Sequence, residues 1–146
     1  MSAVQRKGTT FRDPDRDLWN DVHMLEQRLE LPAQPASARR ARRFVGDLLR
    51  EGADGVCDVC VLLTSELVTN AVLYAQSDIE ISVRLSRDRV RVAVGDASSV
   101  PPVRRLVGTE ATSGRGLALV EALSSAWGVD TSRTGAGKEV WFELGW

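Results

Sequence analysis

The sequence has few of the residues that hold metal ions. Its only histidine is His23, and its only cysteines are Cys57 and Cys60, which form a single C-x-x-C. A zinc site built on these cysteines would need two further ligands. A redox C-x-x-C usually follows a strand and has Gly or Pro between its cysteines, whereas Asp58 and Val59 lie between these two, inside a helical pattern. We therefore expect buried cysteines in a core helix.

The chain also lacks an excess of positive charge, long apolar runs and an apolar N-terminus. It has 19 basic and 20 acidic residues and a net charge of −1, so a general affinity for nucleic acid is not indicated. Apolar runs such as Val59–Leu63 are far shorter than the roughly 20 residues that cross a bilayer. The stretch MSAVQRKGTTFRDPDRD has no apolar core of the signal-peptide kind. We expect a cytoplasmic protein that does not bind nucleic acid directly and is not in a membrane.

What the sequence does contain is an alternation of helical and strand periods. Its 146 residues suit one domain, which we place at 24–146 after a polar extension, 1–23. The patterns predict, in order, a strand at 24–31, helices at 36–50 and 54–75, strands at 79–85 and 90–96, a loop at 97–113, a helix at 114–124, and strands at 127–131 and 138–144. This order predicts an α+β sandwich in which about three helices cover one face of a mostly antiparallel, mixed sheet.

Four arginines occur in the run RRARR, residues 39–43, on the first predicted helix. They face away from its apolar stripe, so a solvated helical face accounts for them. A patch for an acidic partner or a phosphate is the alternative.

Two polar residues border the apolar stripe of the second helix. Glu66 and Asn70 are four residues apart, so they lie on one helical surface. A carboxylate beside an amide oxygen suits a hard cation such as Mg²⁺, and the carboxylate could instead orient a hydroxyl or a water. An exposed border pair would look the same, so these two residues alone leave the choice open.

Asp96 ends a strand on the same side as its core residues. Counting by twos from Val90 brings Asp96 to the core face. A buried carboxylate without a partner is costly, so Asp96 must meet a donor or lie at an open pocket. It could also cap the loop amides of Ser98 and Ser99.

Two glycines stand where the third helix is predicted to start. Gly114 and Gly116 would let a phosphate approach the free N–H groups of that helix, and Arg115 could add a charge-assisted contact. The same G-x-G also serves as a plain turn into a helix. It is neither a P-loop nor a dinucleotide fingerprint.

In this order, the motifs resemble those of the GHKL ATPases, the superfamily of histidine-kinase catalytic domains, Hsp90 and MutL. The shared features are E-x-x-x-N on a helix, a strand ending in Asp, a loop, a G-x-G-L helix start and the closing GKEVWFEL. Over residues 24–146, the stretches LLTSELVTNAV, VGDASSVPP and TSGRGLALVEALSSAWGV are similar to the small anti-sigma-factor serine/threonine kinase-type ATP-binding regulators of actinomycetes. The resemblance implies the Bergerat-type sandwich of that superfamily.

The resemblance also implies a role for each matching residue. Asn70 would bind the Mg²⁺ that bridges the ATP phosphates, Glu66 would be the catalytic base or would position a hydroxyl, and Asp96 would accept a hydrogen bond from the adenine amino group. Residues 97–113 would form the ATP lid. The other implied ATP-binding residues are Ser98, Gly114, Arg115, Gly116, Leu117, Gly137 and Lys138.

The family's activity sets the expected partners. The ATP-bound protein would sequester a sigma factor and phosphorylate a serine of an anti-anti-sigma (STAS-like) protein, and a homodimer is expected. One alternative is a non-catalytic module whose lid responds to ATP and gates a partner surface. A purely structural protein would require the polar motifs to coincide by chance. The sequence departs from the family at Tyr74, where relatives often have His, and at Glu139, where they often have Thr; the latter puts one adenine-side hydrogen bond in question.

Overall fold

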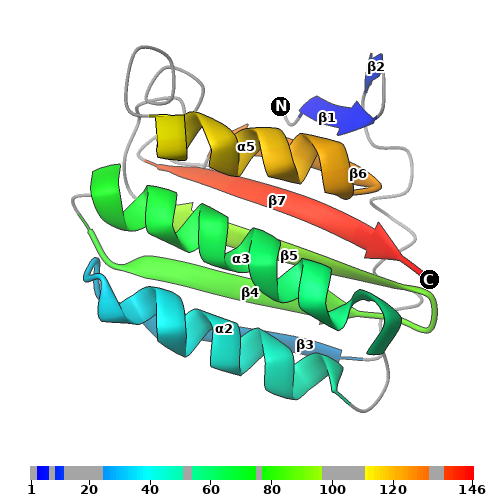
Figure 1. Cartoon of the computed structure of the whole chain (residues 1–146), viewed down its shortest axis with the longest axis horizontal. Helices are drawn as coiled ribbons and strands as arrows, with labels where there is room; N and C mark the ends of the chain where they lie inside the picture. Colours follow the sequence, from blue (N-terminus) through cyan, green and yellow to red (C-terminus); the bar gives the residue numbers. More distant parts are fainter. Residues whose placement is uncertain are drawn as a thin grey trace.

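The computed structural model describes residues 3–6, 9–11, 25–50, 54–74, 77–96, 111–131 and 137–146. Its elements are β1 (Ala3–Arg6), β2 (Thr9–Phe11), β3 (Leu25–Leu31), α2 (Ala36–Leu49), α3 (Asp54–Tyr74), β4 (Ile79–Leu85), β5 (Arg89–Asp96), α5 (Ala111–Leu123), β6 (Ala126–Thr131) and β7 (Lys138–Gly145). Helices α2, α3 and α5 lie on one face of a single sheet, with α3 in the middle (Figure 1). The predicted α+β sandwich is confirmed.

The sheet has seven strands in the order β2-β1-β6-β7-β5-β4-β3. Every pairing between its described strands is antiparallel, so it is less mixed than predicted. Strands β1 and β2 were not predicted, because neither has an alternating apolar pattern long enough to indicate a strand. Strand β1 extends the sheet through backbone pairing with β6, where Val4 lies opposite Gly128, and β2 pairs with β1 at the edge. The domain boundary at residue 24 stays a prediction.

The core lies between the sheet and the helices. In β4 from Ile79 to Leu85 and in β5 from Val90 to Val94, every second residue is buried, as the alternation IEISVRL and VRVAV predicted. These residues pack with others from α3 and β7; the strand residues are Ile79, Ile81, Val83, Val90, Val92 and Phe142, and the helix residues are Leu63, Leu67 and Val68. Complete burial of such a side chain is worth roughly 1.5–3 kcal/mol, so this cluster fixes how α3 sits on the strands.

Helix α3 is apolar around much of its circumference. By length and composition alone, its segment Gly55–Tyr74 is long and apolar enough to cross a membrane. The short unbroken apolar runs of the sequence did not indicate this. A helix with this character is expected wherever other elements surround it. Here the sheet lies beneath α3 and the helices α2 and α5 flank it (Figure 1), which accounts for its buried apolar residues. Leu62 and Leu73 of the same helix are 41% and 61% exposed.

The two cysteines lie in α3 as predicted. Cys60 is fully buried and Cys57 is half-buried, and both are free thiols. Burial raises the pKa of the Cys60 thiol to about 12 because the thiolate would be poorly solvated there. Cys60 is therefore a core residue, not a reactive one.

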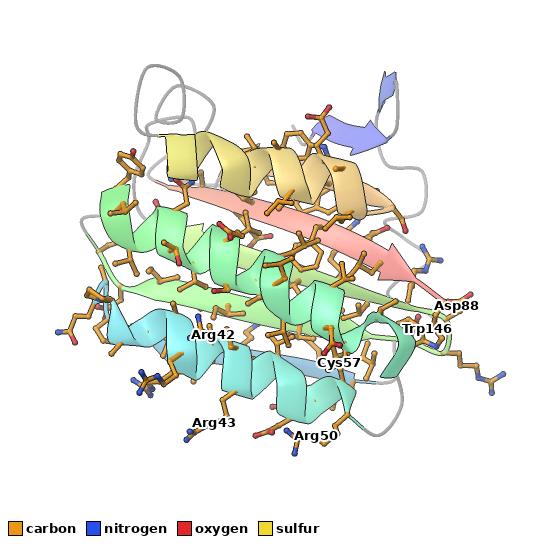
Figure 2. All side chains as sticks on the ribbon, in the orientation of Figure 1. Arg42, Arg43, Arg50, Cys57, Asp88 and Trp146 are labelled. Atoms are coloured by element: carbon orange, nitrogen blue, oxygen red, sulfur yellow. The ribbon has the colours of Figure 1, made fainter. Side chains whose placement is uncertain are left out.

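The arginines of residues 39–43 are exposed on α2. Arg42 donates from Nη1 to the hydroxyl of Ser65 at 2.9 Å, which links α2 to α3. Arg43 and Arg50 lie on the outer edge of α2 (Figure 2). The arrangement fits the solvated face, and the alternative of a patch for an acidic partner stays a prediction.

Candidate functional site

The predicted site residues belong to elements that meet at one end of the sheet. Helix α3 ends at Tyr74 and leads into β4, whose start lies beside the end of β5. Asp96, the last residue of β5, lies opposite Lys138, the first residue of β7. Helix α5 begins at this same end, seen on the left of Figure 1. The topology therefore gathers the end of α3, the start of α5 and the paired ends of β5 and β7.

Asn70 has a buried amide oxygen without a partner. Its Oδ1 accepts no hydrogen bond from any residue that the structure describes. A buried acceptor left unpaired costs about 1–3 kcal/mol, so in native proteins such an atom usually has a water, an ion or a functional reason. Glu66 lies one helical turn earlier and is half-buried. A hard cation that takes oxygen ligands would fit this amide oxygen, and the Mg²⁺ site itself stays a prediction.

Gly116 brings α5 onto α3 beside Glu66. A Cβ at position 116 would lie 3.2 Å from Oε2 of Glu66, which is tighter than most real contacts of this kind, and 3.5 Å from Cβ of Glu66, which is ordinary contact. A side chain at this position would require the Glu66 carboxylate to move by a few tenths of an ångström. Glycine therefore has a packing reason here that the G-x-G pattern did not reveal.

The start of α5 differs from the prediction. The helix begins at Ala111, three residues before the expected start near Gly114. Gly114 and Gly116 thus lie within its first two turns, and Gly116 packs against Glu66 inside the helix instead of marking its start. Within the helix, the N–H groups without an intrahelical partner belong to residues 111–113. A phosphate would meet these groups, one turn earlier than predicted.

The other predicted positions are only partly described. Gly137 is buried and Leu117 is half-buried. Ser98 and residues 97–110 of the expected lid lie outside the described residues, as does the side chain of Arg115. Their roles stay predictions.

Asp96 and Lys138 form a buried ion pair. The Lys138 Nζ donates to both carboxylate oxygens of Asp96, at 3.0 Å to Oδ1 and 2.9 Å to Oδ2. The side chain of Lys138 is 5% exposed and that of Asp96 is 3% exposed. Asp96 lies on the core face, as strand parity predicted, and the donor that it needs is a lysine from the neighbouring strand. The sequence placed both residues in the site but did not predict this contact.

Glu139 lies on the other face of the sheet. It follows Lys138 in β7, so its side chain points away from the helices and stands opposite Asp130 of β6. Burial and, next, the Asp130 carboxylate raise the pKa of Glu139. The loss of an adenine-side hydrogen bond at this position stays a prediction. Lys138 is the residue of β7 that touches Asp96.

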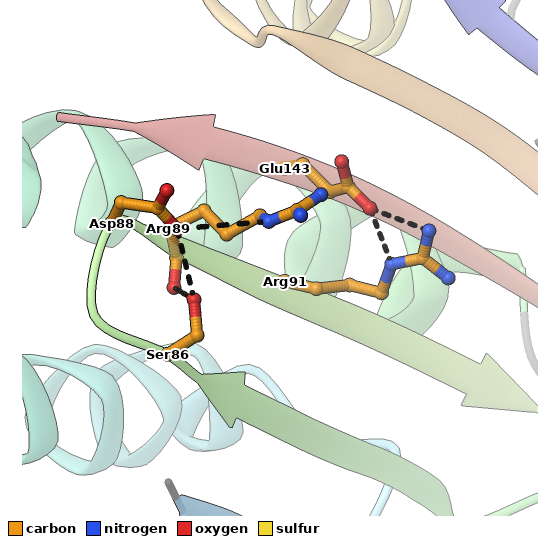
Figure 3. A network of polar contacts seen from close by, with 5 residues as sticks. All are labelled: Ser86, Asp88, Arg89, Arg91 and Glu143. Atoms are coloured by element: carbon orange, nitrogen blue, oxygen red, sulfur yellow. Dashed lines mark hydrogen bonds and ion pairs between the residues drawn. The ribbon is translucent and has the colours of Figure 1, made fainter. Parts of the chain in front are cut away.

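A second buried ion pair on this other face was missed altogether. Arg91 donates to Oε1 of Glu143 from both Nε, at 2.8 Å, and Nη2 (Figure 3), and its guanidinium lies 4.0 Å above the ring centre of Trp141. Arg91 and Glu143 are direct cross-strand neighbours in β5 and β7. Opposite charges at alternating positions of two paired strands would have been the signal. The cluster faces away from the helices and is separate from the candidate site.

Comparison with known proteins gives a family. The family model for the histidine kinase-like ATPase domain matches residues 31–144. Among solved structures, the chain is similar to the RsbU and RsbW domains of Rv1364c from Mycobacterium tuberculosis, with a TM-score of 0.61 and 23% identity over 83% of this chain. The match covers 32% of that chain, so the present protein spans about a third of its length, and at this identity the likeness is one of fold. No curated protein matches.

Proposed function

The chain belongs to the histidine kinase-like ATPase domain family, and we propose that it is an Mg-ATP-binding regulator of the anti-sigma-factor type. In the fuller form of the proposal it is a serine kinase that phosphorylates an anti-anti-sigma protein and sequesters a sigma factor. The family and its fold support nucleotide binding. The kinase activity and the partners rest on the resemblance of the motifs, and so does a cytoplasmic location.

One observation carries the proposal: the buried, unpaired Oδ1 of Asn70. This oxygen would be a ligand of Mg²⁺, which prefers oxygen donors and usually takes its remaining ligands from phosphates and water. Glu66, one turn away, would accept the proton of a serine hydroxyl or position it. Asp96 would hold the base at the ends of β5 and β7. Bound Mg-ATP would supply the phosphoryl group and the metal charge that neutralises it, so the protein's task is largely one of positioning.

Nucleotide binding is tested by titration calorimetry with Mg-ATP. We expect saturable binding by the native chain and a loss of about 10- to 100-fold in Asn70→Ala, as for a lost contact to a charged group. Thr69→Ala is the matched control, because Thr69 is the exposed neighbour on α3. Equal affinity of the two variants would remove Asn70 from the site, and no heat with any Mg-nucleotide would overturn the proposed function.

The kinase is tested with purified anti-anti-sigma proteins, labelled Mg-ATP and phosphosite mapping. Glu66→Gln is the sharper variant, because it keeps the shape that Gly116 packs against and removes only the base. We expect it to retain ATP binding and to lose about 10²–10⁴-fold in the rate of transfer. Tight ATP binding without phosphoserine on any such partner would favour the alternative, a non-catalytic ATP-responsive module.

The partners are tested separately from the chemistry. Sigma factors and anti-anti-sigma proteins are each mixed with the chain, with and without Mg-ATP, and their complexes are measured by size-exclusion chromatography with light scattering. We expect ATP to favour the sigma-factor complex, and the same runs give the oligomeric state against the expected homodimer. Binding that ignores nucleotide would contradict a nucleotide-gated regulator.

A further inference from the structure

The Asp96–Lys138 pair is unusual because it buries a lysine at the candidate site. Lysine is almost never fully buried unless it is paired, and here its ammonium lies within 3.0 Å of both carboxylate oxygens. The residues face each other across β5 and β7 at the last position of one strand and the first of the other. The Lys138 ammonium therefore lies at the candidate site, in direct contact with the Asp96 carboxylate.

Both side chains lie on the side of the sheet that the helices cover. Val94 and Val140 precede and follow the pair on this face, and both belong to the core beneath α3. The pair stands where that core ends, at the same end of the sheet as Asn70. A base held by Asp96 would therefore meet the ammonium of Lys138 as well as the carboxylate.

The chemistry of the pair differs from that of a carboxylate alone. An ionised carboxylate only accepts hydrogen bonds, whereas an ammonium only donates them. A lone carboxylate suits the 6-amino group of adenine and repels the 6-oxo group of guanine, since both are acceptors. Beside a lysine, a 6-oxo group finds a donor, and the N1–H next to it finds the carboxylate. A carboxylate acceptor beside an ammonium donor can therefore form hydrogen bonds with either adenine or guanine.

We propose that Lys138 determines base specificity, and that it makes this site accept guanine nucleotides alongside adenine nucleotides. Lys138 donates to the 6-oxo group of guanine while Asp96 accepts from N1–H; with adenine, Asp96 accepts from the 6-amino group and Lys138 donates to N1. The proposal rests on the proposed function, in that it needs the base of the nucleotide to lie at Asp96.

The test compares nucleotides on the native chain by calorimetry. Mg-ATP, Mg-GTP and Mg-ITP are titrated; ITP keeps the 6-oxo group and N1–H of GTP but has no 2-amino group. We expect dissociation constants for ATP and GTP within about tenfold of each other, and ITP close to GTP. A site that reads only the amino group would reject both oxo nucleotides by orders of magnitude, because a buried polar group would be left unpaired.

The variant Lys138→Met then distinguishes a role of Lys138 in base recognition from a role only in joining β5 to β7. It should weaken GTP and ITP about 10- to 100-fold more than ATP, as expected for a lost hydrogen bond from a charged donor. An ion pair that merely joins β5 to β7 would change all three nucleotides alike. Arg28→Met is the control, since Arg28 is an exposed cation of β3 and should leave every ratio unchanged. If Lys138→Met does not fold, the ratios on the native chain decide.

The outcomes distinguish the two proposals. ATP binding with GTP more than about 100-fold weaker on the native chain would overturn the role of Lys138 and leave the proposed function intact. An ATP-to-GTP ratio that stays the same in Lys138→Met would do so too. Failure of every nucleotide to bind would overturn the proposed function, and the role of Lys138 with it.

Discussion

Strands β5 and β7 are joined by a buried ion pair on each face of the sheet, and the two pairs are built differently. On the helix side Lys138 meets Asp96, with side chains 5% and 3% exposed. On the other side Arg91 meets Glu143, with side chains 11% and 5% exposed. The same two strands therefore bury one pair at their ends and one within their length.

The cations suit different tasks. The Arg91 guanidinium is planar and points two nitrogens at one oxygen of Glu143 (Figure 3). It also lies 4.0 Å from the ring centre of Trp141, so its position is fixed by several contacts at once. The Lys138 ammonium is a compact charge on a flexible stem, with donors that can turn towards a ligand. Burial alone does not distinguish the two pairs, whereas the type of cation and its place along the strand do.

The largest expected effect is on stability when Lys138 is removed. Lys138→Met leaves the Asp96 carboxylate buried beside a methyl group, and breaking such a pair costs about 3–5 kcal/mol. Urea denaturation measures this as a fall in the free energy of unfolding. Asp96→Asn added to Lys138→Met should recover part of the loss, because the uncompensated charge is gone. A single-variant cost below about 1 kcal/mol would show that water reaches the carboxylate, as at an exposed pair.

A smaller effect is expected where only the shape of the cation changes. Arg91→Lys keeps the charge opposite Glu143 but loses one hydrogen bond and the stacking on Trp141, so we expect a loss of about 1–2 kcal/mol in urea denaturation. Arg84→Lys is the control, because Arg84 lies 3.7 Å from Glu26 and is 30% exposed. Equal losses in both variants would mean that the Trp141 contact adds no stability.

Much of the fold was predictable because strand parity and helical periods follow directly from backbone geometry. The alternation of IEISVRL gave the bounds of β4 to the residue, and the same counting put Asp96 on the core face. Asn70 and Glu66 could be proposed as site residues because polar residues bordering an apolar stripe are conspicuous, and their roles stay predictions. Local patterns of this kind are visible in the sequence whatever the rest of the chain does.

What could not be predicted depends on contacts between distant parts of the chain. Lys138 and Asp96 are 42 positions apart, and only the register of β5 with β7 makes them partners. The G-x-G pattern indicated a helix start at Gly116. The contact that Gly116 makes is with Glu66 of another helix, so the sequence could not show it. Strands β1 and β2 pair through their backbones, which have no side-chain signature.

Glu139 offers a pH test on the same face as Arg91. Burial and then Asp130 raise its pKa above the ordinary 4.5. The folded state therefore holds the Glu139 proton more tightly than the unfolded chain. The stability that this proton adds to the folded state is fully present below pH 4.5 and is lost as the pH rises through the folded pKa. Glu139→Gln should be more stable than the native chain at pH 7 and lose less stability between pH 4.5 and 7.

The measurement is urea denaturation across that pH range, with Glu30→Gln as the control because Glu30 is exposed in β3. We expect the control to follow the native pH profile. A Glu139→Gln profile parallel to that of the native chain would mean that Glu139 titrates in its ordinary range in the folded state.

The smallest effect is expected at an exposed pair of the same sheet. Arg28 lies 3.2 Å from Glu80, with side chains 62% and 52% exposed. Arg28→Met removes one positive charge, as Lys138→Met does, yet it should change the free energy of unfolding by only about 0–1 kcal/mol, and less at high salt. Both substitutions replace a cation by methionine within one sheet, so their difference measures what burial adds to an ion pair. A cost near that of Lys138→Met would show that charge, not burial, makes the Asp96 contact strong.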